Sequence, residues 1–267
     1  MSSTTTARSG SAERWGRLWG ARPEDWGRNE DQQIPTYEEA IRRVGIEPGQ
    51  LVLDVGCGTG VFLRLAVDRG AKAFGLDGSE ALIELARARV PEADLRVGEM
   101  QALPYEDDTF DLVTGFNSFF FAADMIEALR EAGRVAQPGA PVVIQVCGRA
   151  EACDLEAMKV VVRPFMPAPP PGSPPALELW KPGVLEAMAT EAGLTPETAF
   201  DTSWPFEYPD EAALGRAMMA PAGIAELVGR SREEAVKAEI VEALAAYRAP
   251  EGGYRLENEF HYLIARA

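Results

Sequence analysis

Histidine, cysteine and positive charge are all scarce in this sequence. The 267 residues include one histidine and three cysteines, and 26 lysines and arginines stand against 42 aspartates and glutamates. The formal net charge of −16 repels nucleic-acid phosphates and anionic lipid surfaces. We therefore expect neither nucleic acid nor a membrane as a partner. The composition gives no indication of an oligomeric state.

Metal-binding patterns and long apolar runs are also absent from the sequence. The cysteines, at positions 57, 147 and 153, are odd in number and lack the spacing of a zinc site. We expect reduced thiols and predict no metal site. No apolar run reaches the roughly 18 residues of a membrane span, and the opening stretch MSSTTTARSGSAER lacks the apolar segment of a secretory signal. Together these absences predict a cytoplasmic protein.

Hydrophobic residues make up 46% of the chain, and from residue 51 they alternate between strand and helix patterns. This alternation predicts an α/β fold: a doubly wound, Rossmann-like parallel sheet with helices on both faces. Two later strands, at 197–208 and 254–267, bring the expected sheet to seven strands. Helical patterns within residues 151–250 predict a cap. The first five strands are expected at 51–55, 71–77, 93–98, 109–116 and 138–147.

The segment LVLDVGCGTG, residues 51–60, joins the first strand to the first helix of this pattern. Glycines at alternate positions in such a turn allow a ligand close to the backbone N–H groups of a helix N-terminus. A dinucleotide fingerprint would require glycine at position 61, which is valine, and a P-loop would require a lysine. The acidic Asp54 disfavours a pyrophosphate and suits a ligand that carries a cationic amine.

Four segments, in order, resemble the class I S-adenosyl-L-methionine (SAM) methyltransferases. LDVGCGTG resembles their motif I, and GLDGSEALIELA resembles their second strand with its ribose-binding acid. GEMQALPYEDDTFDLV is similar to their adenine loop, and LREAGRVAQPGAPVVI to their fifth strand and the helix before it. The resemblance covers residues 50 to about 146, and it is to the ubiquinone/menaquinone-biosynthesis type of small-molecule methyltransferase.

The resemblance implies SAM as the cofactor and assigns roles to individual residues. Asp77, at the end of the second strand, would accept the ribose hydroxyls, as an acid does in dinucleotide sites. Glu99 would accept from the adenine amino group, with the Met100 N–H facing the ring, and Asp54 would act on the methionine part. The full set of expected cofactor-binding residues is Asp54, Gly56, Cys57, Gly58, Gly60, Asp77, Gly78, Glu99, Met100 and Asn117.

Asn117 follows the fourth strand, where ligands lie in this fold, and is expected to hold the methionine end or the acceptor. The alternative is a structural role in a helix-entry turn. The segment NSFF lacks the two prolines of the related motif of amino-group methyltransferases, so that activity is not inferred. At least one of three consecutive phenylalanines, with Phe120 as the candidate, is expected to face the pocket.

Aromatic residues elsewhere are candidates for the acceptor site. Trp19 lies in an N-terminal stretch with two other tryptophans, which forms either a clasp or a lid. Trp180 and Tyr208 are candidate walls of the acceptor site, or alternatively core residues. His261, the only histidine, has either a structural role or a catalytic one as a base for the acceptor, and Asn117 is the second catalytic candidate.

The sequence thus predicts an enzyme that transfers a methyl group from SAM to a small-molecule acceptor by direct in-line displacement. The alternatives are a non-catalytic SAM-binding protein or, less favoured, a dinucleotide-dependent oxidoreductase. The expected divisions are an N-terminal arm with lid helices at 1–48, a SAM-binding core at 49–150, a cap with remaining core elements at 151–250, and a final strand of the same sheet at 251–267. The proline-rich segment at 164–176 is either a surface connector or an active-site flap.

Overall fold

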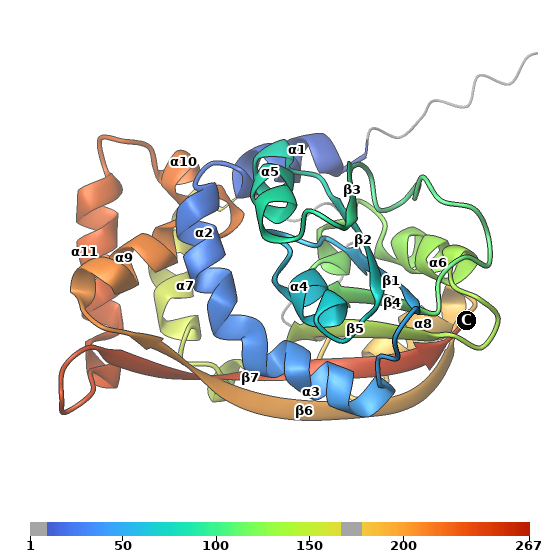
Figure 1. The fold of residues 1–267 in the computed structure, drawn as a ribbon. Helices are drawn as coiled ribbons and strands as arrows, with labels where there is room; N and C mark the ends of the chain where they lie inside the picture. The colour runs from blue at the N-terminus through green and yellow to red at the C-terminus, as the bar shows by residue number, and fades with distance from the viewer. Residues whose placement is uncertain (1–9, 167–177) are drawn as a thin grey trace, which may run out of the picture.

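Seven strands form one mixed sheet in the order β3-β2-β1-β4-β5-β7-β6 (Figure 1). The computed structural model describes residues 10–166 and 178–267. Strands β1 to β5 are parallel, and β7 runs antiparallel to both of its neighbours, β5 and β6. The predicted seven-stranded α/β sheet is confirmed, and only β7 is reversed. The strands are β1 Leu51–Val55, β2 Lys72–Asp77, β3 Asp94–Val97, β4 Leu112–Phe116, β5 Pro141–Cys147, β6 Thr195–Tyr208 and β7 Tyr254–Arg266.

Helices cover both faces of the sheet, as the strand–helix alternation predicts. Helices α3 (Ile34–Val44), α4 (Val61–Val67) and α5 (Glu80–Arg89) pack on one face around a large apolar core. Helices α6 (Met125–Val135) and α8 (Val184–Glu191) pack on the other face around a second core. The central strands are buried on both sides, which explains why their sequences are continuous apolar runs.

Strands β6 and β7 are the longest, with 14 and 13 residues, and they extend beyond the parallel strands. Their far ends carry α7 (Glu156–Val162), α9 (Glu211–Met219), α10 (Ile224–Val228) and α11 (Glu233–Ala243). Figure 1 shows α7, α9 and α11 grouped at this end of the molecule. The group corresponds to the predicted helical cap. The proline-rich segment at 164–176 lies outside the described residues except for its first three positions.

An N-terminal arm connects the parallel core to the cap. It consists of α1 (Ala12–Trp19) and α2 (Pro23–Glu30), which lead into α3. Helix α2 lies between α5 and α9 (Figure 1), and the Tyr208 hydroxyl of β6 donates to Asn29 Oδ1 of α2 at 2.7 Å. Within the described ranges, no helix has both the length and the apolar character to cross a membrane.

Candidate functional site

The turn after β1 has a backbone that only glycine adopts readily. Gly56, Gly58 and Gly60 have φ angles of +79°, +53° and +79°, in the left-handed region. A Cβ on Gly56 would lie 2.4 Å from the Ser118 Cβ. The N–H groups of Gly56 and Cys57 donate to the Leu76 carbonyl oxygen, which ties the turn to the end of β2.

Asp77 joins this turn to the next one. Its Oδ2 accepts from the Gly58 N–H at 3.0 Å, and its Oδ1 accepts from the Ser79 N–H at 2.8 Å. Burial raises the pKa of Asp77 to about 6, against the lowering effect of these hydrogen bonds. The carboxylate therefore lies between the loops at the carboxyl ends of β1 and β2, where ligands bind in open α/β sheets.

A cavity at this edge of the sheet brings together about half of the residues predicted from the sequence. The predicted residues that line it are Gly56, Gly58, Asp77, Gly78, Glu99, Met100, Asn117 and Trp19. The predicted residues that are not part of the lining are Asp54, Cys57, Gly60, Phe120, Trp180, Tyr208 and His261. The second group falls into three cases with different physical reasons.

In the first case, three residues of motif I lie beneath or behind the turn. Asp54 is buried and its Oδ1 accepts from the Thr114 hydroxyl at 2.7 Å, while burial raises its pKa to about 8. The Cys57 side chain points into the core against Gly75, and burial raises the pKa of its thiol. Gly60 is the N-cap of α4 and packs on Ala86 of α5.

In the second case, the aromatic candidates pack elsewhere. The Tyr208 hydroxyl is used in the contact between arm and cap, and Trp180 lies just before α8 on the other side of the sheet. The rings of Phe120 and Phe121 pack in a tilted arrangement with centroids 4.6 Å apart, and Phe121, not Phe120, lines the cavity. The phenylalanine that faces the cavity is therefore the next residue along the chain from the predicted one.

In the third case, His261 is directed away from the cavity. Side chains alternate along β7, and the neighbouring Tyr262 donates to the Thr36 carbonyl oxygen on the face that carries α3. His261 consequently points to the opposite face, where its Nδ1 lies 2.6 Å from Asp201 Oδ1 of β6. Of the two roles considered for His261, this geometry favours the structural one.

A substitution of His261 by glutamine tests this structural role. A general base contributes about 10²–10⁴-fold to a rate, whereas we expect kcat/KM of His261→Gln to stay within about twofold of the wild type. Methyl-transfer kinetics across a range of pH provide the measurement. A loss of tenfold or more with a changed pH profile would restore the catalytic role.

Trp15, Trp19 and Trp26, which are expected from the sequence to form either a clasp or a lid, all line the cavity. Other arm residues in the lining, among them Glu30 and Gln33, are not predicted from the sequence. Trp19 makes edge-to-face contacts with Trp26 and Phe121 at 4.6 and 5.5 Å between ring centroids. These contacts hold the indoles against one another and form an aromatic wall opposite the glycine turn.

A repeated Trp-Gly dipeptide is the sequence signal that could have predicted how the arm packs on the cavity. Each of the three tryptophans is followed directly by a glycine. A Cβ on Gly16 would lie 1.8 Å from the Gly78 carbonyl oxygen, and one on Gly20 would lie 2.5 Å from Ser79 Oγ, whereas one on Gly27 would make an ordinary contact. The tryptophans thus line the cavity while Gly16 and Gly20 let α1 approach the loop after β2.

Polar groups from the arm complete the lining. Glu30 Oε2 accepts from the Thr59 N–H at 2.9 Å and from its hydroxyl at 2.8 Å. The side-chain oxygens of Gln33 and Gln145 accept from Asn117 Nδ2 at 3.3 and 3.1 Å. Asn117 has a φ of +51°, uncommon for a residue other than glycine, and these two bonds help to hold its side chain at the cavity.

Glu99 connects the arm to the loop after β3. Its Oε2 accepts from the Ala12 N–H at 2.9 Å, at the N-terminus of α1. Its Oε1 accepts from the Gln101 N–H at 3.2 Å and from the Ser11 hydroxyl at 3.4 Å. The carboxylate expected at the adenine thus also receives hydrogen bonds from the arm that covers the cavity.

The raised pKa of Asp54 gives a prediction for stability. The pKa of the Asp54 carboxyl rises from 3.8 to about 8 on folding. Its contribution to the stability of the folded state is therefore complete below about pH 4 and is lost as the pH rises to 8. Asp54→Asn keeps an acceptor for Thr114 and cannot ionise. We expect the difference in melting temperature between this variant and the wild type to shift by several degrees in favour of the variant when the pH is raised from 5 to 8. A difference that is constant with pH would contradict this account.

Across residues 10–166 and 178–267, no group of three or more His, Cys, Asp or Glu side chains is arranged to hold a metal ion. The cavity instead combines carboxylates, glycine turns and aromatic side chains. Burial raises the pKa of Glu30 to about 7, and Asp77 lies near it. Such a donor set fits a ligand with hydroxyl groups, cationic groups and an apolar part.

Comparisons with known proteins identify the family of this domain. Residues 53–144 match the protein family described as "Methyltransferase domain". A demethylmenaquinone methyltransferase of Bacillus mycoides is 35% identical over 114 residues, which are 40% of this chain and 48% of that protein. The chain thus spans about half the length of the curated relatives it matches.

Solved structures show the same fold. The YcgJ protein of Bacillus subtilis superposes with a TM-score of 0.59 at 17% identity, covering 87% of this chain and 97% of that one. A SAM-dependent methyltransferase from Aquifex aeolicus gives a TM-score of 0.52 at 14% identity, covering 90% and 98% of the two chains. Residues 53–144 therefore form a class I methyltransferase domain similar to that of the quinone-biosynthesis enzymes, and the cofactor of such a domain is SAM.

Proposed function

We propose that the chain transfers a methyl group from SAM to a small apolar or aromatic acceptor by direct in-line displacement. The observation that carries this proposal is the convergence of four features on one cavity: the glycine turn, Asp77, Glu99 and the tryptophan wall. The first three features fit the polar parts of the cofactor. The wall fits an apolar acceptor.

The proposed cofactor contacts are those implied by the family resemblance, and the lining of the cavity supports them. Asp77 binds the ribose hydroxyls, and Glu99 binds the adenine amino group with Met100 beside it. The Gly56–Gly58 turn lies against the methionine part, where a Cβ would obstruct the approach. Asn117, held by Gln33 and Gln145, lies at the end of β4 and is proposed to orient the methionine end or the acceptor.

The protein contributes mainly alignment and a dry site in this proposal. SAM supplies an electrophilic sulfonium methyl, so no further activation of the donor is required. Holding donor and acceptor in line supplies about 7–11 kcal/mol of the rate enhancement. Trp15, Trp19 and Trp26 exclude water from the cavity and provide apolar contact to the acceptor.

The same proposal divides the chain by role. Residues up to 48 form the arm that closes the cavity, and residues 49–150 form the SAM-binding core. Residues 151–250 supply the cap with remaining core elements, and residues 251–267 supply the last strand of the sheet.

A methyl-transfer assay tests the proposal. Purified protein is incubated with SAM labelled at the methyl group and with quinol acceptors, beginning with the demethylmenaquinone named for the relatives, in its reduced form. We expect label in an aromatic or apolar acceptor, and much less label with Asp77→Ala when SAM is below saturation. If S-adenosylhomocysteine binds tightly while no acceptor of a broad panel is labelled, the chain is a SAM-binding protein without transfer activity.

A further inference from the structure

Three carboxylates surround the glycine turn, and each has a different environment. Asp54 lies beneath the turn with Thr114, and Asp77 lies beside it with both oxygens bonded to loop N–H groups. Glu30 reaches the turn from the arm and is only 3% exposed. Of the three, only Asp77 and Glu30 line the cavity.

The Glu30 carboxylate lies directly over the turn. A Cβ on Gly58 would be 2.8 Å from both of its oxygens. Thr59 supplies the two hydrogen bonds that hold the carboxylate at the N-terminus of α4. The absence of a side chain at Gly58 thus leaves the carboxylate facing the space where the methionine part of the cofactor is proposed to lie.

A buried carboxylate of this kind requires a positive partner to ionise at low cost. Arg89 favours the ionised form of Glu30 and Asp77 opposes it, and Asp54 and Tyr37 also lie close enough to interact. Arg89 itself pairs with Asp31 at 3.1 Å. Among the described residues, no basic side chain forms an ion pair with Glu30, which leaves its charge to be balanced by a cationic ligand.

We propose that Glu30 binds the α-ammonium group of the methionine part of SAM. This inference rests on the proposed function and transfers to an arm residue the role that the sequence suggests for Asp54. Asp54 does not line the cavity, and the two oxygens of Asp77 are directed to the loops and the ribose. Because Glu30 is the last residue of α2, the contact also links cofactor binding to the position of the arm.

Two ligands that differ only in the amino-acid part test the inference. S-adenosylhomocysteine carries the ammonium group, whereas 5′-methylthioadenosine has the same adenosine and thioether without it. We expect Glu30→Gln to weaken S-adenosylhomocysteine binding by about 10- to 100-fold, the effect of losing a charged hydrogen bond. Binding of 5′-methylthioadenosine should change by less than about twofold. Isothermal titration calorimetry at pH 8 measures both affinities.

The glutamine variant keeps an oxygen that can accept from Thr59, so the arm should remain in place. Glu24→Gln, on the exposed side of the same helix, is the matched control and should leave both affinities unchanged. Equal losses for both ligands would show that Glu30 acts only through loop structure and would overturn the inference, as would no loss for either. If the wild type binds neither ligand, the proposed function itself fails.

Discussion

Replacing Asp77 with alanine is expected to lower the affinity for SAM by at least about 100-fold, since two charged hydrogen bonds to the ribose are lost at about 1.5–3 kcal/mol each. The substitution also removes the acceptor of the Gly58 and Ser79 N–H groups, which loosens the loops after β1 and β2. Calorimetric titration with S-adenosylhomocysteine measures the effect.

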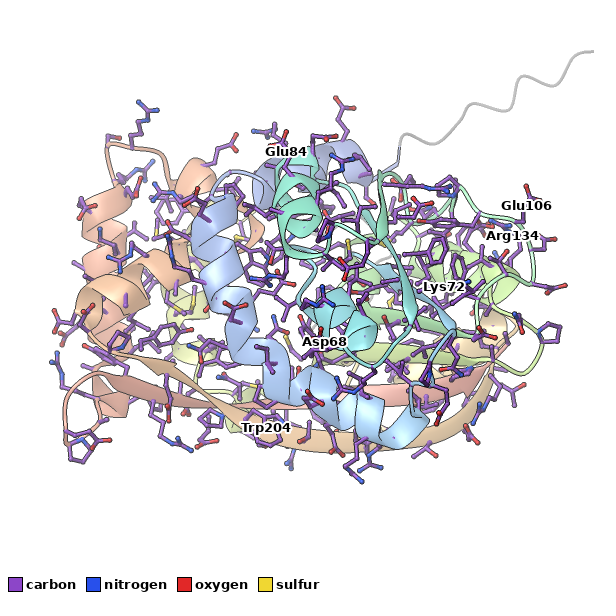
Figure 2. All side chains as sticks on the ribbon, in the orientation of Figure 1. Asp68, Lys72, Glu84, Glu106, Arg134 and Trp204 are labelled. Carbon is purple, nitrogen blue, oxygen red and sulfur yellow. The ribbon has the colours of Figure 1, made fainter. Side chains whose placement is uncertain are left out.

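Two further variants separate these contributions. Asp77→Asn keeps one acceptor oxygen and should lose less affinity than Asp77→Ala. Glu84→Ala removes an exposed acid that points away from α5 (Figure 2), and it should leave the affinity unchanged. If Asp77→Ala binds S-adenosylhomocysteine as the wild type does, the ribose is not at Asp77 and the assignment of the cofactor site is wrong.

Adding a single methyl group to Gly16 is expected to displace the arm and weaken cofactor binding about tenfold. The new Cβ would lie 1.8 Å from the Gly78 carbonyl oxygen, so the backbone of α1 or of the loop has to move. Overpacking of this kind costs about 1–3 kcal/mol. The shift would also disturb the hydrogen bond between the Ala12 N–H and Glu99. Titration with S-adenosylhomocysteine and thermal melting of Gly16→Ala provide the measurement.

Gly27→Ala is the matched control in the same arm. Its Cβ would meet Thr59 Cγ2 at 3.4 Å, an ordinary contact, and alanine is favoured over glycine inside a helix by about 1 kcal/mol. We therefore expect unchanged affinity and equal or higher thermal stability. If the two variants bind S-adenosylhomocysteine with the same affinity, the close approach of α1 to Gly78 does not determine cofactor binding.

The sequence predicted the parallel core well because its signals are local. Motif I, the acid that ends β2 and the N-cap Ser79 each depend on residues within one turn or strand end. Ser79 Oγ accepts from the Leu82 N–H at the start of α5, as its position predicts. Each of these features is fixed by backbone geometry that a few neighbouring residues determine.

The arm could not be placed from the sequence in the same way. Glu30 reaches Thr59 across 29 positions of the chain, and Asn117 reaches Gln33 across 84. Such contacts depend on how α2 and α3 cross the sheet edge, which no local pattern specifies. The tryptophan–glycine pairs are the one local signal, and they indicate which helix face approaches the loops.

The reasons why three of the predicted residues do not line the cavity are equally specific. His261 follows the alternation of β7, but the sequence alone does not tell which face of that strand carries α3. Phe120 and Phe121 are adjacent in a single 3-10 turn, Phe119–Phe121, so their directions depend on the exact start of that turn. Asp54 is in motif I as expected, yet Thr114 of the neighbouring strand β4 binds it beneath the turn.

The most direct test of the central claim is thermal melting of the purified protein with S-adenosylhomocysteine, with NADH in parallel. A ligand at 100 times its dissociation constant stabilises the folded state by about 2.7 kcal/mol, which corresponds to several degrees for a chain of this size. We predict that S-adenosylhomocysteine raises the melting temperature and NADH does not. A shift with NADH alone, or with neither ligand, would contradict the assignment of the cavity to SAM.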